Sequence, residues 1–263
     1  MSETMVSERL SRRTFFGISA LLFAASAAVT IVWCASMSTM GEMPMPGGWT
    51  MSMAWMRMCG QTWPNAAASF IGMWVAMMVA MMLPSLTPVL WRYRQAVGTS
   101  SGWLTAVVGA GYFFVWAVLG AAAFALGSAL AALEMQLPAL ARSVPIATGV
   151  VVLIGGALQF TSWKTRHLAC CRDVSRCDRV MRADAATAGR HGLRLGVHCS
   201  ICCAGLTAIL LVMGVMDLRV MAAVTAAITV ERLAPAGERA ASAIGAAVVV
   251  LGVIMIVRAM GLG

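Results

Sequence analysis

Charged residues and histidines are scarce in this chain of 263 residues: charged side chains make up 11% of it, and only three histidines occur. Soluble globular domains carry about 25% charged residues, so the low value excludes an ordinary soluble domain. Three histidines cannot form the clusters of imidazoles and carboxylates that metal-dependent enzymes use. A phosphate-binding loop is also missing, so primary active transport would need another subunit. We therefore expect that the chain is not an enzyme.

Apolar residues are abundant instead, at 60% of the chain, with a mean hydropathy of +0.85. A helix that crosses the hydrocarbon core of a bilayer needs about 20 apolar residues. Six runs meet this need: Phe15 to Met37, Ala66 to Leu90, Trp103 to Leu133, Ser143 to Phe160, Leu195 to Met216 and Ala240 to Val257. A seventh, Val220 to Leu233, reaches only about 21 Å as a helix, so it is a short span or a re-entrant segment. The sequence predicts an all-α, polytopic membrane helix bundle of about seven transmembrane helices, forming one integral membrane domain over residues 1–263.

The basic residues predict the orientation of this bundle, because short cytoplasmic loops carry an excess of Lys and Arg. With a cytoplasmic N-terminus and seven spans, only four of the 19 Lys and Arg residues face outside: Arg57, Arg142, Arg219 and Arg258. The largest cytoplasmic loop, residues 161–194, is rich in both arginine and cysteine. Basic loops beside anionic lipid account for the net charge of +9, so we expect the lipid bilayer and no nucleic acid as a partner.

A methionine-rich segment, residues 38–65, would then lie on the extracytoplasmic side. Pro44, Pro46 and the glycines beside them exclude a packed helix there. Thioether sulfur is a soft, uncharged ligand that suits Cu(I), so we predict metal ligands among Met40, Met43, Met45, Met51, Met53, Met56, Met58 and Cys59. The alternative is that these methionines fill space or dock a partner. Cys59 could also pair with Cys34 in a disulfide, and the sequence leaves this choice open.

More methionines follow in the second apolar run. Met73, Met77 and Met81 recur every four residues, with Met78 and Met82 beside them, so their sulfurs form a stripe on one helical face. The stripe is a candidate path for a soft metal ion. Methionines at this spacing also pack well between membrane helices, and that alternative stays open.

Cysteines and histidines crowd the predicted cytoplasmic side in two segments. They supply His167, Cys170, Cys171, Cys177, His198, Cys199, Cys202 and Cys203 as candidate metal ligands. Cys199, Cys202 and Cys203 fall at i, i+3 and i+4 of a helix, so the three thiols share one side. In a reducing cytosol such clusters bind metals more often than they form disulfides. The alternatives are small buried apolar residues or a dithiol oxidoreductase.

The stretches that hold these residues are MWVAMMVAMMLPS, LQFTSWKTRHLACCR, HCSICCAGL and GVMDLRVMAAVTAAITVERLAPAG. Together they resemble a bacterial family of predicted metal-binding integral membrane proteins, over roughly Met73 to Gly237. On its pattern fall Gln159, Lys164, Cys171, Arg172, Cys199, Cys202, Cys203 and Glu231, with His167, Asp217 and Arg232 where the pattern has Cys, Asn and Lys. The resemblance implies metal binding and a multi-pass location in the bacterial inner membrane.

Two functions remain in view. The first is a membrane protein that accepts Cu(I) at the methionine-rich segment and passes it to the Cys and His ligands, or to a partner such as a copper chaperone. The second is an accessory or assembly subunit of a membrane complex, with a structural Zn(II) or Cu(I) site on the cytoplasmic face. Asp217 and Glu231, at the ends of the short seventh run, are functional candidates because carboxylates near a bilayer are costly. Pairing with Arg219 or Arg232 is their alternative role.

Overall fold

The computed structural model describes residues 2–39, 41, 43–57, 60–98, 102–172 and 184–261. Eight α-helices make up most of this part of the chain: α1 (Ser2–Ser38), α2 (Trp63–Val97), α3 (Gly102–Gln136), α4 (Pro138–Leu158), α5 (Ser162–Arg172), α7 (Ala185–Gly214), α8 (Leu218–Leu233) and α9 (Gly237–Ala259). The all-α prediction is confirmed. Four predicted ligands, Met40, Met58, Cys59 and Cys177, lie outside the described residues, as does the side chain of Cys170.

Six of these helices are long and apolar enough to cross a membrane: Arg9–Met37 within α1, α2, α3, α4, α7 and α9. They coincide with the six long apolar runs of the sequence. The predicted seventh run is also helical, as part of α8, but its 16 residues reach only about 24 Å. The number of spans and the cytoplasmic position of the N-terminus therefore stay predictions.

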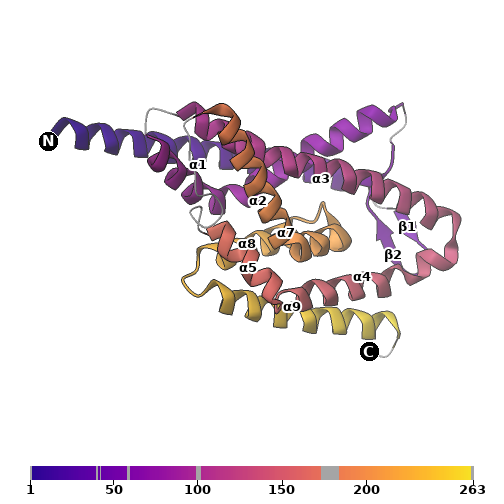
Figure 1. Cartoon of the computed structure of the whole chain (residues 1–263). Helices are drawn as coiled ribbons and strands as arrows, with labels where there is room; N and C mark the ends of the chain where they lie inside the picture. The colour runs from indigo at the N-terminus through magenta and orange to yellow at the C-terminus, as the bar shows by residue number, and fades with distance from the viewer. Residues whose placement is uncertain are drawn as a thin grey trace.

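Helix α7 lies at the centre of the bundle, where it packs against α3, α4, α5 and α8. Small residues allow two of these approaches. A Cβ atom on Gly192 of α7 would clash with the backbone of Val108 in α3, and one on Gly205 would lie 2.9 Å from the Gly155 carbonyl oxygen in α4. In Figure 1, α4 and α9 run side by side below α7, and α5 and α8 lie beside it.

The methionine-rich segment forms a β-hairpin, in agreement with the exclusion of a helix. Strands β1 (Met43–Met45) and β2 (Trp49–Met51) pair antiparallel with Met43 opposite Met51, and the short 3₁₀-helix η1 (Met53–Trp55) follows. The hairpin sits near the turn between α3 and α4 (Figure 1). Trp49 fixes it there, because its indole Nε1 donates a hydrogen bond to the Ala141 carbonyl oxygen at 2.8 Å.

Candidate metal centre

Four thiols meet where α5 packs against the middle of α7. Cys199, Cys202 and Cys203 of α7 are buried, and Cys171 of α5 is buried beside them. The Sγ atoms of Cys199 and Cys203 lie 4.0 Å apart, and Cys171 is hydrogen-bonded to both Cys199 and Cys202. These hydrogen bonds raise the pKa of the Cys171 thiol. We call this group the thiol cluster: Cys171, Cys199, Cys202 and Cys203.

The position of the cluster follows from the length of α7. We predicted a span that opens at Leu195, with the cysteines at its end. The helix begins instead at Ala185, where the Asp184 carboxylate caps it by accepting a hydrogen bond from the Thr187 amide at 2.8 Å. Cys199 to Cys203 therefore lie in the interior of α7 and are enclosed by neighbouring helices.

The spacing of the cluster suits a soft cation. Sulfurs that share a tetrahedral ion at bonds of about 2.3 Å lie about 3.8 Å apart, close to the 4.0 Å between Cys199 and Cys203. All five cysteines whose side chains are described, these four and Cys34, are free thiols. Within the described ranges, no three His, Cys, Asp or Glu side chains already surround a common point as a metal site would. Closing around an ion would therefore require rotation of the cysteine side chains.

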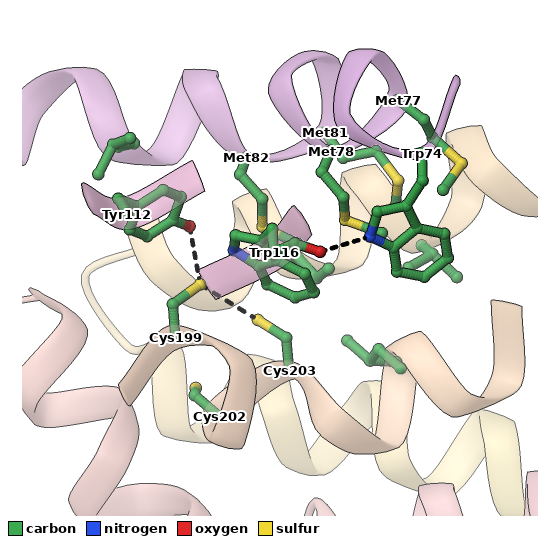
Figure 2. Packing of buried hydrophobic residues seen from close by; sticks show 14 of the residues in the cluster. Trp74, Met77, Met78, Met81, Met82, Tyr112, Trp116, Cys199, Cys202 and Cys203 are labelled. Atoms are coloured by element: carbon green, nitrogen blue, oxygen red, sulfur yellow. Dashed lines mark hydrogen bonds between the residues drawn. The ribbon is translucent and has the colours of Figure 1, made fainter. Parts of the chain in front are cut away.

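A tyrosine from α3 completes one side of the cluster. The Tyr112 hydroxyl donates a hydrogen bond to Cys199 Sγ at 2.9 Å, and the ring is fully buried (Figure 2). Hydrogen bonds to a charged acceptor are stronger than those to a neutral one. Tyr112 can therefore stabilise a sulfur that carries negative charge, and nothing in its local sequence marked it as a site residue.

Three charged side chains are buried beside the thiols, although α8 and α5 supply them from distant parts of the sequence. Lys164 Nζ donates hydrogen bonds to Glu231 Oε2 at 2.7 Å and to the Cys202 carbonyl oxygen at 2.8 Å. Desolvation lowers the pKa of Lys164, but Cys202 and Glu231 outweigh it and raise that pKa overall. Lys164 is therefore held as a cation against α7.

Arg232 is the third of these charged groups. We expected it among the solvated arginines of the cytoplasmic segments, but it is only 5% exposed, because α8 packs against α2 and α7. Its Nη1 donates to Ser85 Oγ at 2.8 Å, and its charge acts on Cys199, Cys171 and Cys203. Among the described residues, the Nε and Nη2 atoms of Arg232 have no hydrogen-bond partner. Arg232 lies at the end of an apolar run, where a charged residue is costly unless it has a function, and this position could have indicated that it belongs to the site.

The two carboxylates singled out from the sequence have different roles. Glu231 pairs with Lys164, not with Arg232 as its alternative role proposed. Asp217 caps α8, since its Oδ1 accepts hydrogen bonds from the amides of Arg219 and Val220 at 2.7 and 3.4 Å. Asp217 is therefore explained by helix capping, whereas Glu231 belongs to the surroundings of the thiol cluster.

The methionine stripe of α2 lies in the same core as the thiol cluster. Met73, Met77, Met78, Met81 and Met82 are all buried, and they belong to one continuous core with the cysteines of α7. In Figure 2 the side chain of Met82 extends from α2 toward α7, in the direction of Cys199 and Cys203. Two groups of residues that were predicted separately therefore lie in one core.

The predicted histidines form a pair next to the cluster. His167 of α5 and His198 of α7 approach each other with 3.2 Å between their Nδ1 atoms, and both are partly buried. Each lies one helical turn from a cluster cysteine, His167 before Cys171 and His198 before Cys202. The pair therefore extends the row of soft and borderline ligands along the contact between α5 and α7.

The hairpin methionines lie apart from the thiol cluster. Met45 and Met51 are buried in a separate small core with Ala131 and Ala141, and Met43, Met53 and Met56 are partly buried. Beside the hairpin lies a cavity of about 1450 Å³, with Met51 and Met53 among its lining residues. The hairpin therefore borders this wide cavity, and its buried methionines belong to a different core from the thiol cluster.

Comparison with known proteins gives one result. Residues 71–255 match the sequence profile of a family described as PpoB2: Copper chaperone. This range contains the methionine stripe, the thiol cluster and the Lys164–Glu231 pair, and it leaves out the hairpin. No curated protein and no solved structure matches the chain.

Proposed function

Because this chain belongs to the PpoB2 copper chaperone family, we propose that it binds Cu(I) inside a membrane bundle and moves it from the methionine hairpin to the thiol cluster. The observation that carries this proposal is the continuous core that joins the methionine stripe of α2 to the cysteines of α7. Copper is the cargo here, taken up at one end of this row of sulfurs and handed to a partner at the other.

The order of ligands along this route favours transfer in one direction. The hairpin and the stripe offer neutral thioethers, which are soft ligands for Cu(I). Because a thioether carries no proton, its affinity for Cu(I) does not depend on pH. The cluster offers thiols, which become stronger, charged ligands when they lose their protons. A cuprous ion therefore gains affinity as it passes from Met73 toward Cys203.

The buried charges match the charge of a cuprous dithiolate complex. Lys164, Glu231 and Arg232 together carry one net positive charge at neutral pH. One Cu(I) held by two thiolates carries one net negative charge, so complex and surroundings are neutral together. Zn(II) held by four thiolates would carry two negative charges and leave one uncompensated, which is costly in an apolar interior.

A structural metal site is the second candidate, and one observation favours it. The cluster joins two helices, since Cys171 comes from α5 and the other thiols come from α7. A tightly held Zn(II) would fasten α5 to the bundle, and the protein would then serve as an accessory or assembly subunit of a membrane complex.

Metal analysis of the full chain separates the two candidates. The protein is purified anaerobically, supplied with Cu(I) or Zn(II), and compared with a triple variant, Cys199→Ser, Cys202→Ser and Cys203→Ser. Ser200→Ala on the same helix is the control. We expect the wild type and the control to retain Cu(I) against a chelator and the triple variant to lose that tight binding. Retention of zinc alone would favour the structural site, and failure to bind either metal would overturn the proposal.

A further inference from the structure

A second group of sulfurs lies between the hairpin and the methionine stripe. Cys34, near the end of α1, is buried with its Sγ 4.0 Å from Met216 Sδ, in the segment between α7 and α8. Met37 follows Cys34 by one helical turn. Met53 of η1 and Met73 of α2 border a small cavity together with Met37 and Met216. We call these five residues the junction site.

Two cavities meet at this site. The wide cavity of about 1450 Å³ is bordered by Cys34, Met37, Met53 and Met216. A small cavity of about 30 Å³ is bordered by Met37, Met53, Met216 and Met73. The three shared methionines therefore form the wall between the wide cavity and Met73, the first residue of the stripe.

The small cavity has the lining for a soft cation. Five methionines of the described part of the chain border it: Met37, Met53, Met56, Met73 and Met216. Gln61 and Ser69 are the polar side chains among the described residues that border it, and no carboxylate or imidazole is among them. Such a lining disfavours Ca²⁺, Mg²⁺ and Zn²⁺, and it suits Cu(I).

We propose that the junction site is a second Cu(I) site, which holds copper between the wide cavity and the methionine stripe. Cys34 supplies a thiolate, and Met216, with Met37 or Met53, supplies thioethers, since these four residues border the wide cavity together. When Cu(I) binds, the Cys34 thiol gives its proton to water in the wide cavity, and the resulting Cu(I)–thiolate unit is neutral. This inference rests on the proposed function, because it makes the site the first step of the same route.

The two sites can be tested separately in the full chain. In the triple serine variant of α7, Cu(I) titration against a competing chelator should still find one site, weaker than the thiol cluster. X-ray absorption of this copper should show sulfur ligands. Adding Cys34→Ser should weaken the remaining site at least tenfold. Adding Met216→Leu, which keeps the volume but removes the sulfur, should weaken it less, and Met135→Leu on the exposed part of α3 should leave it unchanged.

Each outcome bears on one proposal or the other. If the triple variant binds no Cu(I), or binds it equally well without Cys34 and Met216, the junction site is refuted while the thiol cluster can still stand. If the triple variant binds as tightly as the wild type and loses this binding with Cys34→Ser, the junction site stands and the proposed transfer to the cysteines fails. Circular dichroism and elution volume in detergent show that each variant compared is folded.

Discussion

The two ends of the sulfur-lined route differ in charge. At the hairpin end, the small core consists of Met45, Met51, Ala131 and Ala141, all neutral. At the other end, the thiols lie beside buried Lys164, Glu231 and Arg232. A neutral sulfur site holds a cation weakly and releases it easily, whereas a cationic environment stabilises an anionic metal–thiolate complex. In the proposed function this difference favours transfer toward the cysteines, and it can be tested at either end.

The largest effect is expected from breaking the Lys164–Glu231 pair. Glu231→Gln leaves the buried Lys164 ammonium without its carboxylate, and removal of one member of a buried pair costs about 3–5 kcal/mol. We expect a large drop in the unfolding temperature in detergent. The double variant Lys164→Met with Glu231→Gln should recover much of the loss, since it no longer holds a buried ammonium without its carboxylate.

A control lies at the far end of α8. Asp217→Asn keeps a capping oxygen at the start of the helix, and Asparagine caps about as well as aspartate, so it should change the unfolding temperature little. Equal stability of Glu231→Gln and the wild type would show that the pair does not hold α5 against the bundle.

The next effect concerns Arg232 and copper affinity. A unit charge about 5 Å from an anionic sulfur contributes roughly 3 kcal/mol at an effective dielectric constant of about 20. Arg232→Leu should therefore weaken Cu(I) binding at the thiol cluster by roughly 100-fold, and Arg232→Lys should weaken it less. Chelator competition measures this, with the exposed Arg219→Leu as control. If Arg232→Leu binds Cu(I) as tightly as the wild type, the buried positive charge does not contribute to copper affinity at the thiol cluster.

The methionine stripe tests whether the two ends are connected. Met78→Leu with Met82→Leu conserves volume, and such exchanges usually cost less than about 1.5 kcal/mol each. The equilibrium affinity of the cysteines should stay the same. In proteoliposomes, added Cu(I) protects the α7 cysteines from alkylation. The rate at which this protection develops should be roughly tenfold lower in the double variant than in the control Met135→Leu. Unchanged protection rates would mean that the stripe only packs the bundle.

The features that could be predicted from the sequence are those determined by residues close together in the chain. A run of about 20 apolar residues is long enough to form a membrane-spanning helix, and the six predicted runs are helical in the structure. Proline and glycine between methionines excluded a helix at 43–51. The i, i+3, i+4 spacing placed three thiols on one side of α7.

The parts that escaped prediction depend on which helices pack together. Nothing near Lys164 in the sequence indicates Glu231, and nothing near Cys199 indicates Tyr112. The Tyr112–Cys199 contact exists because glycines such as Gly192 and Gly196 let α7 approach α3 closely. Helix α5 was expected as part of a loop because several of its residues are basic. The sequence therefore did not indicate that Leu168 and Cys171 form a buried face of a helix.

The smallest expected effect comes from the two tyrosines, which form a matched pair. The Tyr112 hydroxyl donates to Cys199 Sγ, whereas the buried Tyr93 hydroxyl has no hydrogen-bond partner in the part of the chain that the structure describes. A hydrogen bond of this kind contributes about 1 kcal/mol, so Tyr112→Phe should weaken Cu(I) binding roughly fivefold. Tyr93→Phe should leave copper affinity unchanged and be neutral or slightly favourable for stability, because it removes a buried hydroxyl without a partner. Chelator competition on both variants measures the difference. If the two variants bind Cu(I) alike, Cys199 does not carry the charge that Tyr112 stabilises, and the metal would have to be held by the other thiols of the cluster.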